Sequence, residues 1–367
     1  MSPLLEVEDL RVTFATEDGP VHAVDGISYS VDTGATLGIV GESGSGKSVS
    51  SLTTLGLTRA KNTQISGRIL WDGSDLVTAS QAELRRIRGN EIAMIFQDPL
   101  SSLHHFYTVG WQLIEAMRTH RSISRSAARA RAVDLLELVG IPDPRNRVDQ
   151  YPHEFSGGMR QRAMIAMALA NEPKLLIADE PTTALDVTVQ AQILALLDDL
   201  QRRLGMAIII ITHDLGVVAE TADEIGVMYA GRIVEHASTA QIFDSPQHPY
   251  TWGLLTSIPR FDTDRHAELV PISGRPPSLI HRPSGCFFHP RCPYVREAHK
   301  RIDPKLEPVA GDPGHEAACL LEPEIRTAIW KGLQSGESPA ELRRLAGEYP
   351  STVRTTAAAA PTQDGDA

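Results

Sequence analysis

The stretch from Gly41 to Ser48 carries the most specific chemistry in this sequence. It runs Gly-Glu-Ser-Gly-Ser-Gly-Lys-Ser and fits the phosphate-binding pattern G-x-x-x-x-G-K-[ST] at every position. Its glycines allow backbone N–H groups to turn toward an anion. Lys47 would place a positive charge on the β- and γ-phosphates, and the Ser48 hydroxyl can bind Mg²⁺. A Gly/Ser linker is the alternative, but a linker needs no buried strand before it and no Gly-Lys-Ser ending.

A second candidate for phosphate binding is Ser156-Gly157-Gly158. It precedes a helical pattern from Arg160 to Ala170, so it predicts another helix N-terminus that can hold an anion. One phosphate chain does not need two such sites from one subunit. We therefore expect the second site to serve the nucleotide of a partner subunit.

Four apolar runs predict the buried strands of a parallel sheet. Polar side chains follow three of them, at the strand ends where ligands bind in open α/β sheets. The predicted strands cover residues 36–40, 92–96, 175–178 and 206–211, and the polar residues that follow are Gln97, Asp179, Glu180 and His213.

Asp179 and Glu180 form a pair of carboxylates at one of these strand ends. We expect Asp179 to hold Mg²⁺, directly or through water. Glu180 is then placed to accept a proton from an attacking water. Because Pro181 and Thr182 follow, a helix N-cap is the alternative role for Glu180.

The order and spacing of these motifs resemble those of ABC-type ATPases over residues 1–245. A further matching motif, Ala184-Leu185-Asp186, lies between Glu180 and His213. The resemblance implies an α/β fold: a P-loop NTPase core with a RecA-like parallel sheet, an antiparallel β-subdomain and a helical subdomain. It also implies two subunits that sandwich two ATP molecules, each bound by one P-loop and by the partner's Ser-Gly-Gly segment.

The same resemblance implies roles for single residues. His213 matches the γ-phosphate sensor of the family. Gln97 matches the residue that reaches Mg²⁺ and the water and links the site to a membrane partner. With Glu180, these are the expected catalytic residues. The expected nucleotide-binding residues are Phe14, Gly41, Ser43, Gly44, Ser45, Gly46, Lys47, Ser48, Val49, Gln97, Ser156, Gly157, Gly158 and Asp179, and the expected Mg²⁺ ligands are Ser48, Gln97 and Asp179.

Phe14 has two interpretations that the sequence leaves open. It matches the aromatic position of the family, where it would stack on adenine, and it also suits simple core packing. The insertion Glu17-Asp18-Gly19 loosens the register, so His22 is another candidate to lie near the base.

The composition agrees with an enzyme that acts without nucleic acid. The 367 residues are 42% hydrophobic and 22% charged, and the net charge of −11 argues against a nucleic-acid surface. The first ten residues lack a basic region and a long apolar run, so we expect no signal peptide. No apolar stretch approaches the length of a membrane span, and three cysteines do not suggest a disulfide framework.

We expect three regions along the chain. Residues 1–245 form the ABC ATPase domain, with a helical subdomain at about 98–160. Residues 246–330 form a C-terminal extension, and residues 331–367 hold a C-terminal helix and a disordered tail. Apolar spacing predicts helices over residues 109–117, 127–139 and 187–204.

The extension narrows the type of transporter. Ser245–Thr251 with Leu254-Leu255 resembles the extension of ATPase subunits from dipeptide and oligopeptide importers, as do Tyr151–Glu154 and Met159. One departure is His104-His105 where the family has Asn-Pro. The resemblance implies two permease subunits, a second ATPase that is a paralogue and an extracytoplasmic peptide-binding protein. It places the chain on the cytoplasmic face of the membrane. The alternatives are import of nickel or a glycan, or a non-transport ABC protein.

Three cysteines and a histidine predict a metal site in the extension. They are Cys286, Cys292, His299 and Cys319. The corresponding family pattern has four cysteines that bind a [4Fe–4S] cluster, and His299 stands where the third would fall. A Cys₃His zinc site and no metal are the alternatives. His281, His289 and His315 are expected bystanders, with His289 able to substitute for His299.

Overall fold

The computed structural model describes residues 3–98, 102–183, 185–257 and 272–347. The predicted disordered tail and Ala184 lie outside the described residues.

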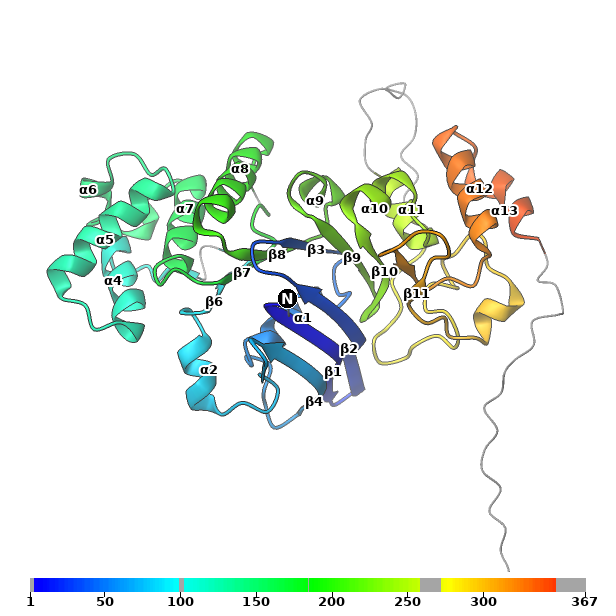
Figure 1. Ribbon diagram of the computed structural model, residues 1–367, viewed down its shortest axis with the longest axis horizontal. Coiled ribbons are helices and arrows are strands. Elements are labelled where there is room, and N and C mark those ends of the chain that lie inside the picture. The colour runs from blue at the N-terminus through cyan, green and yellow to red at the C-terminus, as the bar shows by residue number, and fades with distance from the viewer. Residues whose placement is uncertain (1–2, 99–101, 184, 258–271, 348–367) are drawn as a thin grey trace, which may run out of the picture.

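An eight-stranded sheet runs through the centre of the molecule in the order β11-β12-β10-β9-β3-β8-β7-β6 (Figure 1). The strands β3, β6, β7 and β8 pair in parallel, which confirms the parallel sheet. The strands of this sheet are β3 Thr36–Val40, β6 Ile92–Ile95, β7 Leu175–Asp179, β8 Ala207–Thr212, β9 Glu224–Tyr229, β10 Arg232–Ser238, β11 Glu307–Pro308 and β12 Glu316–Ala317.

The predicted strands are confirmed to within a residue at each end. Every residue of β3, β7 and β8 is buried, as continuous apolar runs require. Alternate side chains enter opposite layers of the core: Ile208 and Ile210 pack in one hydrophobic cluster, and Ile209 and Ile211 in the other. The sheet therefore has a packed core on both faces.

A second, antiparallel sheet of four strands has the order β2-β1-β4-β5. This confirms the antiparallel N-terminal strands. Its members are β1 Leu5–Thr16, β2 Gly19–Val31, β4 Thr63–Trp71 and β5 Ser74–Asp75, with the short helix α2 Gln81–Ile87 after them. Leu5, Leu10 and Ile69 of this sheet are fully buried against the layer that also holds Ile209 and Ile211.

The predicted helices are also confirmed. The spacing over 109–117 lies within α4 Val109–His120, and the pattern over 127–139 lies in α5 Arg125–Leu138. The chain leaves α5 through Gly140, whose φ of +74° favours glycine. Figure 1 shows α4, α5, α6 and α7 together on one side of the sheet and α12 and α13 at the other. The remaining helices are α1 Lys47–Thr54, α6 Pro144–Arg147, η1 Pro152–Glu154, α7 Gly157–Ala168, α8 Val187–Leu204, α9 Leu215–Thr221, α10 Thr239–Asp244, α11 Pro249–Thr256, η2 Glu297–Lys300, α12 Pro323–Gln334 and α13 Pro339–Ala346.

The helix α8 has the same bounds as the predicted helix over 187–204. Its buried face holds Ile193, Leu197 and Leu200 as expected, and it also holds Leu194. A glycine in the left-handed region, Gly205, ends the helix.

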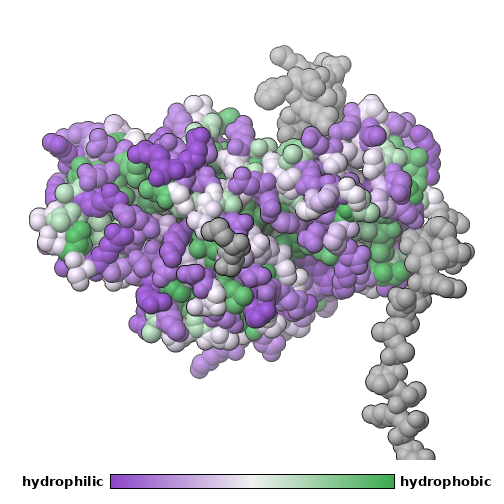
Figure 2. Space-filling view, in the orientation of Figure 1, coloured by the Kyte–Doolittle hydropathy of each residue, from purple (hydrophilic) through white to green (hydrophobic). Residues whose placement is uncertain are grey.

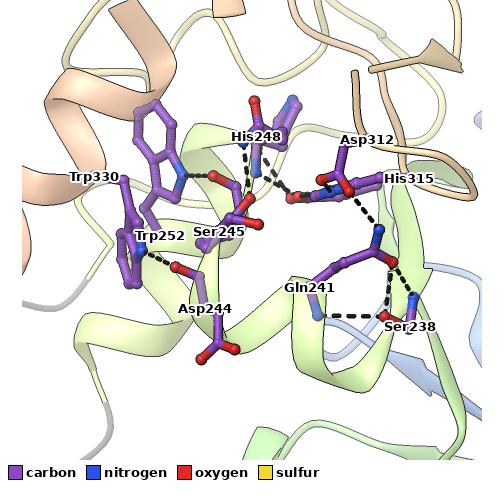
Figure 3. A network of polar contacts seen from close by, with 12 residues as sticks. Ser238, Gln241, Asp244, Ser245, His248, Trp252, Asp312, His315 and Trp330 are labelled. Carbon is purple, nitrogen blue, oxygen red and sulfur yellow. Dashed lines mark hydrogen bonds and ion pairs between the residues drawn. The ribbon is translucent and has the colours of Figure 1, made fainter. Parts of the chain in front are cut away.

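The extension is joined to the core sheet. β12 pairs with β10, and β11 pairs with β12, so residues beyond 300 continue the sheet that begins in the ATPase core. Figure 3 shows the polar network at this joint, where His315 and Gln241 both point to Asp312. The indole N–H of Trp330 on α12 donates to the Asp244 carbonyl at 2.9 Å. These bonds hold the extension against α10 and β10.

Figure 2 shows a largely hydrophilic face with scattered apolar patches. Within the described ranges, we find no helix with the length and apolar character that crossing a bilayer requires.

Candidate active site

The phosphate-binding loop, Gly41–Ser48, joins the end of β3 to the start of α1. Glycine is required at both ends of its turn. A Cβ on Gly41 would lie 2.1 Å from the Met228 carbonyl oxygen, and one on Gly46 would lie 2.2 Å from the Ala23 carbonyl oxygen. Gly46 also has φ +101° directly before α1. The glycines thus place a helix N-terminus at the end of a buried strand, which is the arrangement that binds phosphate.

Lys47 lies under this loop with only 5% of its surface exposed. Its Nζ donates to the Gly41 carbonyl at 2.6 Å and to the Glu42 carbonyl at 3.0 Å. Burial lowers the pKa of Lys47, although the nearby carboxylates Glu180, Asp179 and Glu42 act to raise it. The ammonium group is therefore held at the loop by oxygen atoms that a phosphate could replace.

Two of the expected Mg²⁺ ligands meet. The Ser48 hydroxyl donates to Asp179 Oδ1 at 3.1 Å, which joins the start of α1 to the end of β7. Burial raises the pKa of Asp179 more than the Ser48 hydrogen bond lowers it. A hydroxyl oxygen and a carboxylate are the oxygen ligands that Mg²⁺ uses, so this pair fits the ion.

Glu180 is the centre of a second group of side chains. Its carboxylate accepts hydrogen bonds from Gln97 Nε2 at 2.9 Å and from Thr183 Oγ1 at 2.8 Å, and it lies 3.2 Å from His213 Nδ1. Burial acts to raise the pKa of Glu180, but the hydrogen bonds from Thr183 and His213 outweigh it and the pKa is lowered. Glu180 is therefore ionised at neutral pH. The N-cap of α8 is Asp186, so the alternative role of Glu180 as a helix cap is wrong.

Ser156-Gly157-Gly158 lies at the N-terminus of α7. Ser156 is the N-cap, and its hydroxyl accepts a hydrogen bond from the Met159 N–H at 3.3 Å. Ser156 and Gly157 are exposed, and a Cβ on Gly157 would meet no atom of the chain within 4 Å. The helix that was predicted from residue 160 begins at Gly157. Among the described residues, we find no hydrogen bond that joins this segment to Lys47 or Glu180.

Phe14 lies on β1 opposite Val21 and packs, half-buried, against the core. His22 pairs with Thr13, and its Nδ1 lies 3.0 Å from the Thr13 hydroxyl. The two interpretations of Phe14 therefore stay open, since a half-buried ring serves either one.

The predicted metal ligands do not form a ligand cage. No group of three or more His, Cys, Asp or Glu side chains among the described residues is arranged to hold a metal. The Nδ1 of His299 accepts the Arg296 N–H at 3.0 Å, and its buried Nε2 has no hydrogen-bond partner among the described residues. Burial raises the pKa of the Cys286 thiol and raises that of Cys319 to about 12.

The expected bystander His315 is a buried structural residue. Its Nε2 lies 2.8 Å from Glu235 Oε1, and its Nδ1 lies 2.8 Å from Asp312 Oδ2. Burial acts to lower the pKa of His315, but the two carboxylates outweigh it and raise the pKa. The His315 side chain thus joins β10 to the extension.

Three residues that contact the site were not predicted from the sequence, because they lie outside its motifs. Thr183 binds Glu180, and a Thr three residues after the carboxylate was the available signal. Arg291 and Tyr250 both contact Glu42 in the phosphate-binding loop. Arg291 lies 249 positions from Glu42, so no local pattern could reveal the pair.

Two family models match parts of the chain. Residues 24–183 match the model described as ABC transporter. Residues 234–298 match the model described as the C-terminal region of oligopeptide/dipeptide transporters. The first match contains the phosphate-binding loop, Gln97, Ser156–Gly158, Asp179 and Glu180, and the second contains the first part of the extension.

Curated proteins with similar sequences cover most of the chain. The oligopeptide transport ATP-binding protein OppD of Bacillus subtilis is 52% identical over 88% of this chain and 90% of its own length. The dipeptide transport ATP-binding protein DppD of Escherichia coli is 51% identical over 86% of this chain and 96% of its own.

Solved structures with the same fold cover the ATPase core. The ATP-binding cassette MJ0796, a dimer in a post-hydrolysis state bound to ADP and Pi, aligns with 64% of this chain and 98% of its own, at a TM-score of 0.58 and 25% identity. The CbiO1 protein of Clostridium perfringens aligns with 67% of this chain and 92% of its own, at a TM-score of 0.57 and 31% identity.

Proposed function

This chain belongs to the ATP-binding subunits of ABC transporters for oligopeptides and dipeptides, and from that membership we infer that it binds and hydrolyses ATP to power peptide import. Relatives that are half identical over nearly their full length carry this inference. Within the chain, one observation supports it above the others. Lys47, the adjacent Asp179 and Glu180, and His213 come from three separate segments and converge at one edge of the central sheet.

Each residue has a role that its surroundings support. Lys47 neutralises phosphate charge, and the backbone N–H groups of the loop bind phosphate oxygens. Ser48, Asp179 and Gln97 would hold Mg²⁺, which neutralises charge on the phosphates. Glu180 orients the attacking water and accepts its proton, a role supported by its lowered pKa. His213, which lies 3.2 Å from Glu180, would contact the γ-phosphate.

The signature segment Ser156–Gly158 serves the nucleotide of a second ATPase subunit. Its exposure and the open space beside Gly157 support this, because the segment presents a helix N-terminus that its own chain leaves uncovered. The solved dimeric cassette with ADP and Pi supports the dimer. We take the second subunit to be a paralogue.

The chain works with two permease subunits and an extracytoplasmic peptide-binding protein. Its place is then the cytoplasmic face of the membrane, where it is held by the permeases. The decisive experiment is to express it with candidate permeases and a partner ATPase, reconstitute the complex in liposomes, and measure ATP-dependent peptide uptake. A complex that takes up nickel or a glycan and no peptide would contradict the peptide assignment, and failure to associate with any permease would contradict the transport role.

We also propose that the extension binds a [4Fe–4S] cluster through Cys286, Cys292, Cys319 and His299. Two observations support it. Burial raises the pKa values of Cys292 and Cys319, and the charge of a neighbouring cysteine adds to each increase, which indicates that the three sulfurs lie near one another. The Nε2 of His299 is buried without a hydrogen-bond partner. Binding requires His299 and the thiols to move from the arrangement described above.

Elemental analysis and electron paramagnetic resonance of anaerobically purified protein test this proposal. We expect iron and sulfide in the wild type and in His299→Cys, and loss of both in Cys292→Ser. Zinc without iron would replace the cluster with a Cys₃His zinc site. Folded protein with neither metal would leave three structural thiols.

A further inference from the structure

Two residues of the extension, Arg291 and Tyr250, form hydrogen bonds to Glu42 of the phosphate-binding loop. We propose that Arg291 and Tyr250 are positioning residues for nucleotide binding, which fix Glu42 and neutralise its charge so that the loop can accept phosphate. The proposal rests on the ATP-binding function argued above and makes the extension a part of the nucleotide site.

Arg291 holds the Glu42 side chain with both arms of its guanidinium group. Nη1 donates to Oε2 at 2.6 Å, and Nη2 donates to Oε1 at 2.9 Å. The Arg291 side chain is 3% exposed and that of Glu42 is 29% exposed. A two-point, largely desolvated pair of this kind is strong and directional.

Contacts along the Arg291 side chain fix the direction of its guanidinium group. Its Nε donates to the Ser273 carbonyl at 3.0 Å. Its guanidinium carbon lies 5.8 Å from the centre of the Tyr229 ring and 5.9 Å from that of Phe288. With its direction fixed in this way, Arg291 gives Glu42 one position and not several.

The backbone of Glu42 is fixed from the same side. Its N–H donates to the hydroxyl of Tyr250, a buried residue of α11, at 2.8 Å. Its carbonyl accepts Lys47 Nζ at 3.0 Å. Glu42 therefore connects two extension residues directly to the lysine that would meet the phosphates.

The ion pair between Arg291 and Glu42 also neutralises the negative charge of Glu42. A carboxylate in a loop that receives a polyphosphate would repel it, unless a cation neutralises it. The Glu42 carbonyl binds Lys47 Nζ, and the Glu42 carboxylate is one of three that oppose the lowering of the Lys47 pKa by burial. The Glu42 charge therefore lies within electrostatic range of a phosphate bound at Lys47. Arg291 is the cation that forms the direct ion pair with Glu42 among the described residues.

A double-mutant cycle tests the proposal in the full-length chain, with ATP affinity measured by isothermal titration calorimetry. Arg291→Met should weaken ATP binding by about tenfold or more, since it leaves the half-buried Glu42 carboxylate unpaired in the loop that receives the phosphates. Glu42→Gln should change it less, and adding Glu42→Gln to Arg291→Met should restore most of the loss. Arg291→Lys should be intermediate, because it keeps the charge and loses the two-point geometry.

Arg282→Met is the matched control. Arg282 also joins the extension to the core, but it binds Asp25 on β2 at 2.5 Å and does not contact the loop. It should leave ATP affinity within about twofold of the wild type, a difference of under 1 kcal/mol. If Arg291→Met fails to fold, Tyr250→Phe provides a second test, because it removes only the hydroxyl that accepts the Glu42 N–H. This variant should weaken ATP binding.

The outcomes separate this inference from the function on which it rests. Wild-type protein that fails to bind ATP would overturn the function itself. If the wild type binds ATP and Lys47→Ala abolishes binding, the function stands. Arg291→Met with wild-type affinity, or with a loss that Glu42→Gln does not relieve, would then overturn the positioning role alone.

Discussion

At the residue scale, Glu180 combines an unusual backbone with three side-chain partners. Its φ of +48° is uncommon for a residue other than glycine, and its N–H is held by the Ile211 carbonyl at 2.8 Å. The left-handed backbone lets Asp179 face Ser48 while Glu180 faces Gln97 and His213. The adjacent carboxylates of Asp179 and Glu180 therefore contact different sets of side chains.

Glu180→Gln should keep ATP binding and lower ATP turnover by about 10²-fold or more, because an amide cannot accept the proton of the water. The measurement is phosphate release by the assembled complex, with ATP affinity as the control. The variant should also accumulate as an ATP-bound dimer in size-exclusion chromatography. Turnover near that of the wild type would show that Glu180 is not the base, provided that the partner's site has been inactivated.

At the element scale, the joint between β10 and the extension depends on buried charge. Glu235 on β10 is fully buried and accepts the N–H groups of Gln247 and His248 as well as contacting His315. Strands β11 and β12 have two residues each, which is too short to hold the extension by backbone pairing alone. The His315 bridge supplies the missing attachment.

His315→Gln should destabilise the protein, and the effect should depend on pH. The pKa of His315 is raised in the folded state, so its contribution is complete below the unfolded pKa of about 6.5 and is lost as pH rises through the folded pKa. Near pH 6 we expect a loss of about 3 kcal/mol, typical of a broken buried pair.

The measurement is the free energy of unfolding in urea at several values between pH 6 and pH 9. The difference between wild type and His315→Gln should shrink as pH rises. His281→Gln is the control, because His281 lies on the surface side of the extension and lacks carboxylate partners in the ion pairs described. A difference that stays constant, or that grows with pH, would contradict a charged bridge.

At the scale of the whole molecule, we expect a second subunit to complete the ATP site. The phosphate-binding loop and Glu180 lie within the core, whereas Ser156–Gly158 caps a helix that faces outward. Transport then requires that two subunits close on ATP and that the permeases follow this motion.

Ser156→Arg tests this division between subunits. It should leave ATP affinity in the isolated subunit within about twofold of the wild type, yet abolish ATP-driven dimerisation, because a bulky cation would occupy the partner's γ-phosphate site. Calorimetry and light scattering measure the two properties separately. A loss of ATP affinity in the monomer would instead place Ser156 at its own nucleotide.

Local pattern was sufficient for the elements and for most of the ATP site. The strands β3, β7 and β8 are continuous apolar runs, and parallel strands bring their carboxyl ends to one edge whatever the connections between them. That rule alone predicts that Lys47, Asp179, Glu180 and His213 come together. The phosphate-binding loop is likewise a local structure, defined by its glycines.

Tertiary packing decided the rest, because those contacts join segments that no periodicity relates. The pairing of Arg291 with Glu42 depends on how the extension folds back over the end of β3. The local sequence pattern predicts a role for the cysteines on either side of Arg291 and none for the arginine itself. The Nδ1 of His299 accepts a hydrogen bond from the Arg296 N–H, a contact that the spacing of possible ligands does not reveal. Spacing along a chain indicates which atoms can meet, whereas the packing around each side chain determines which of them do.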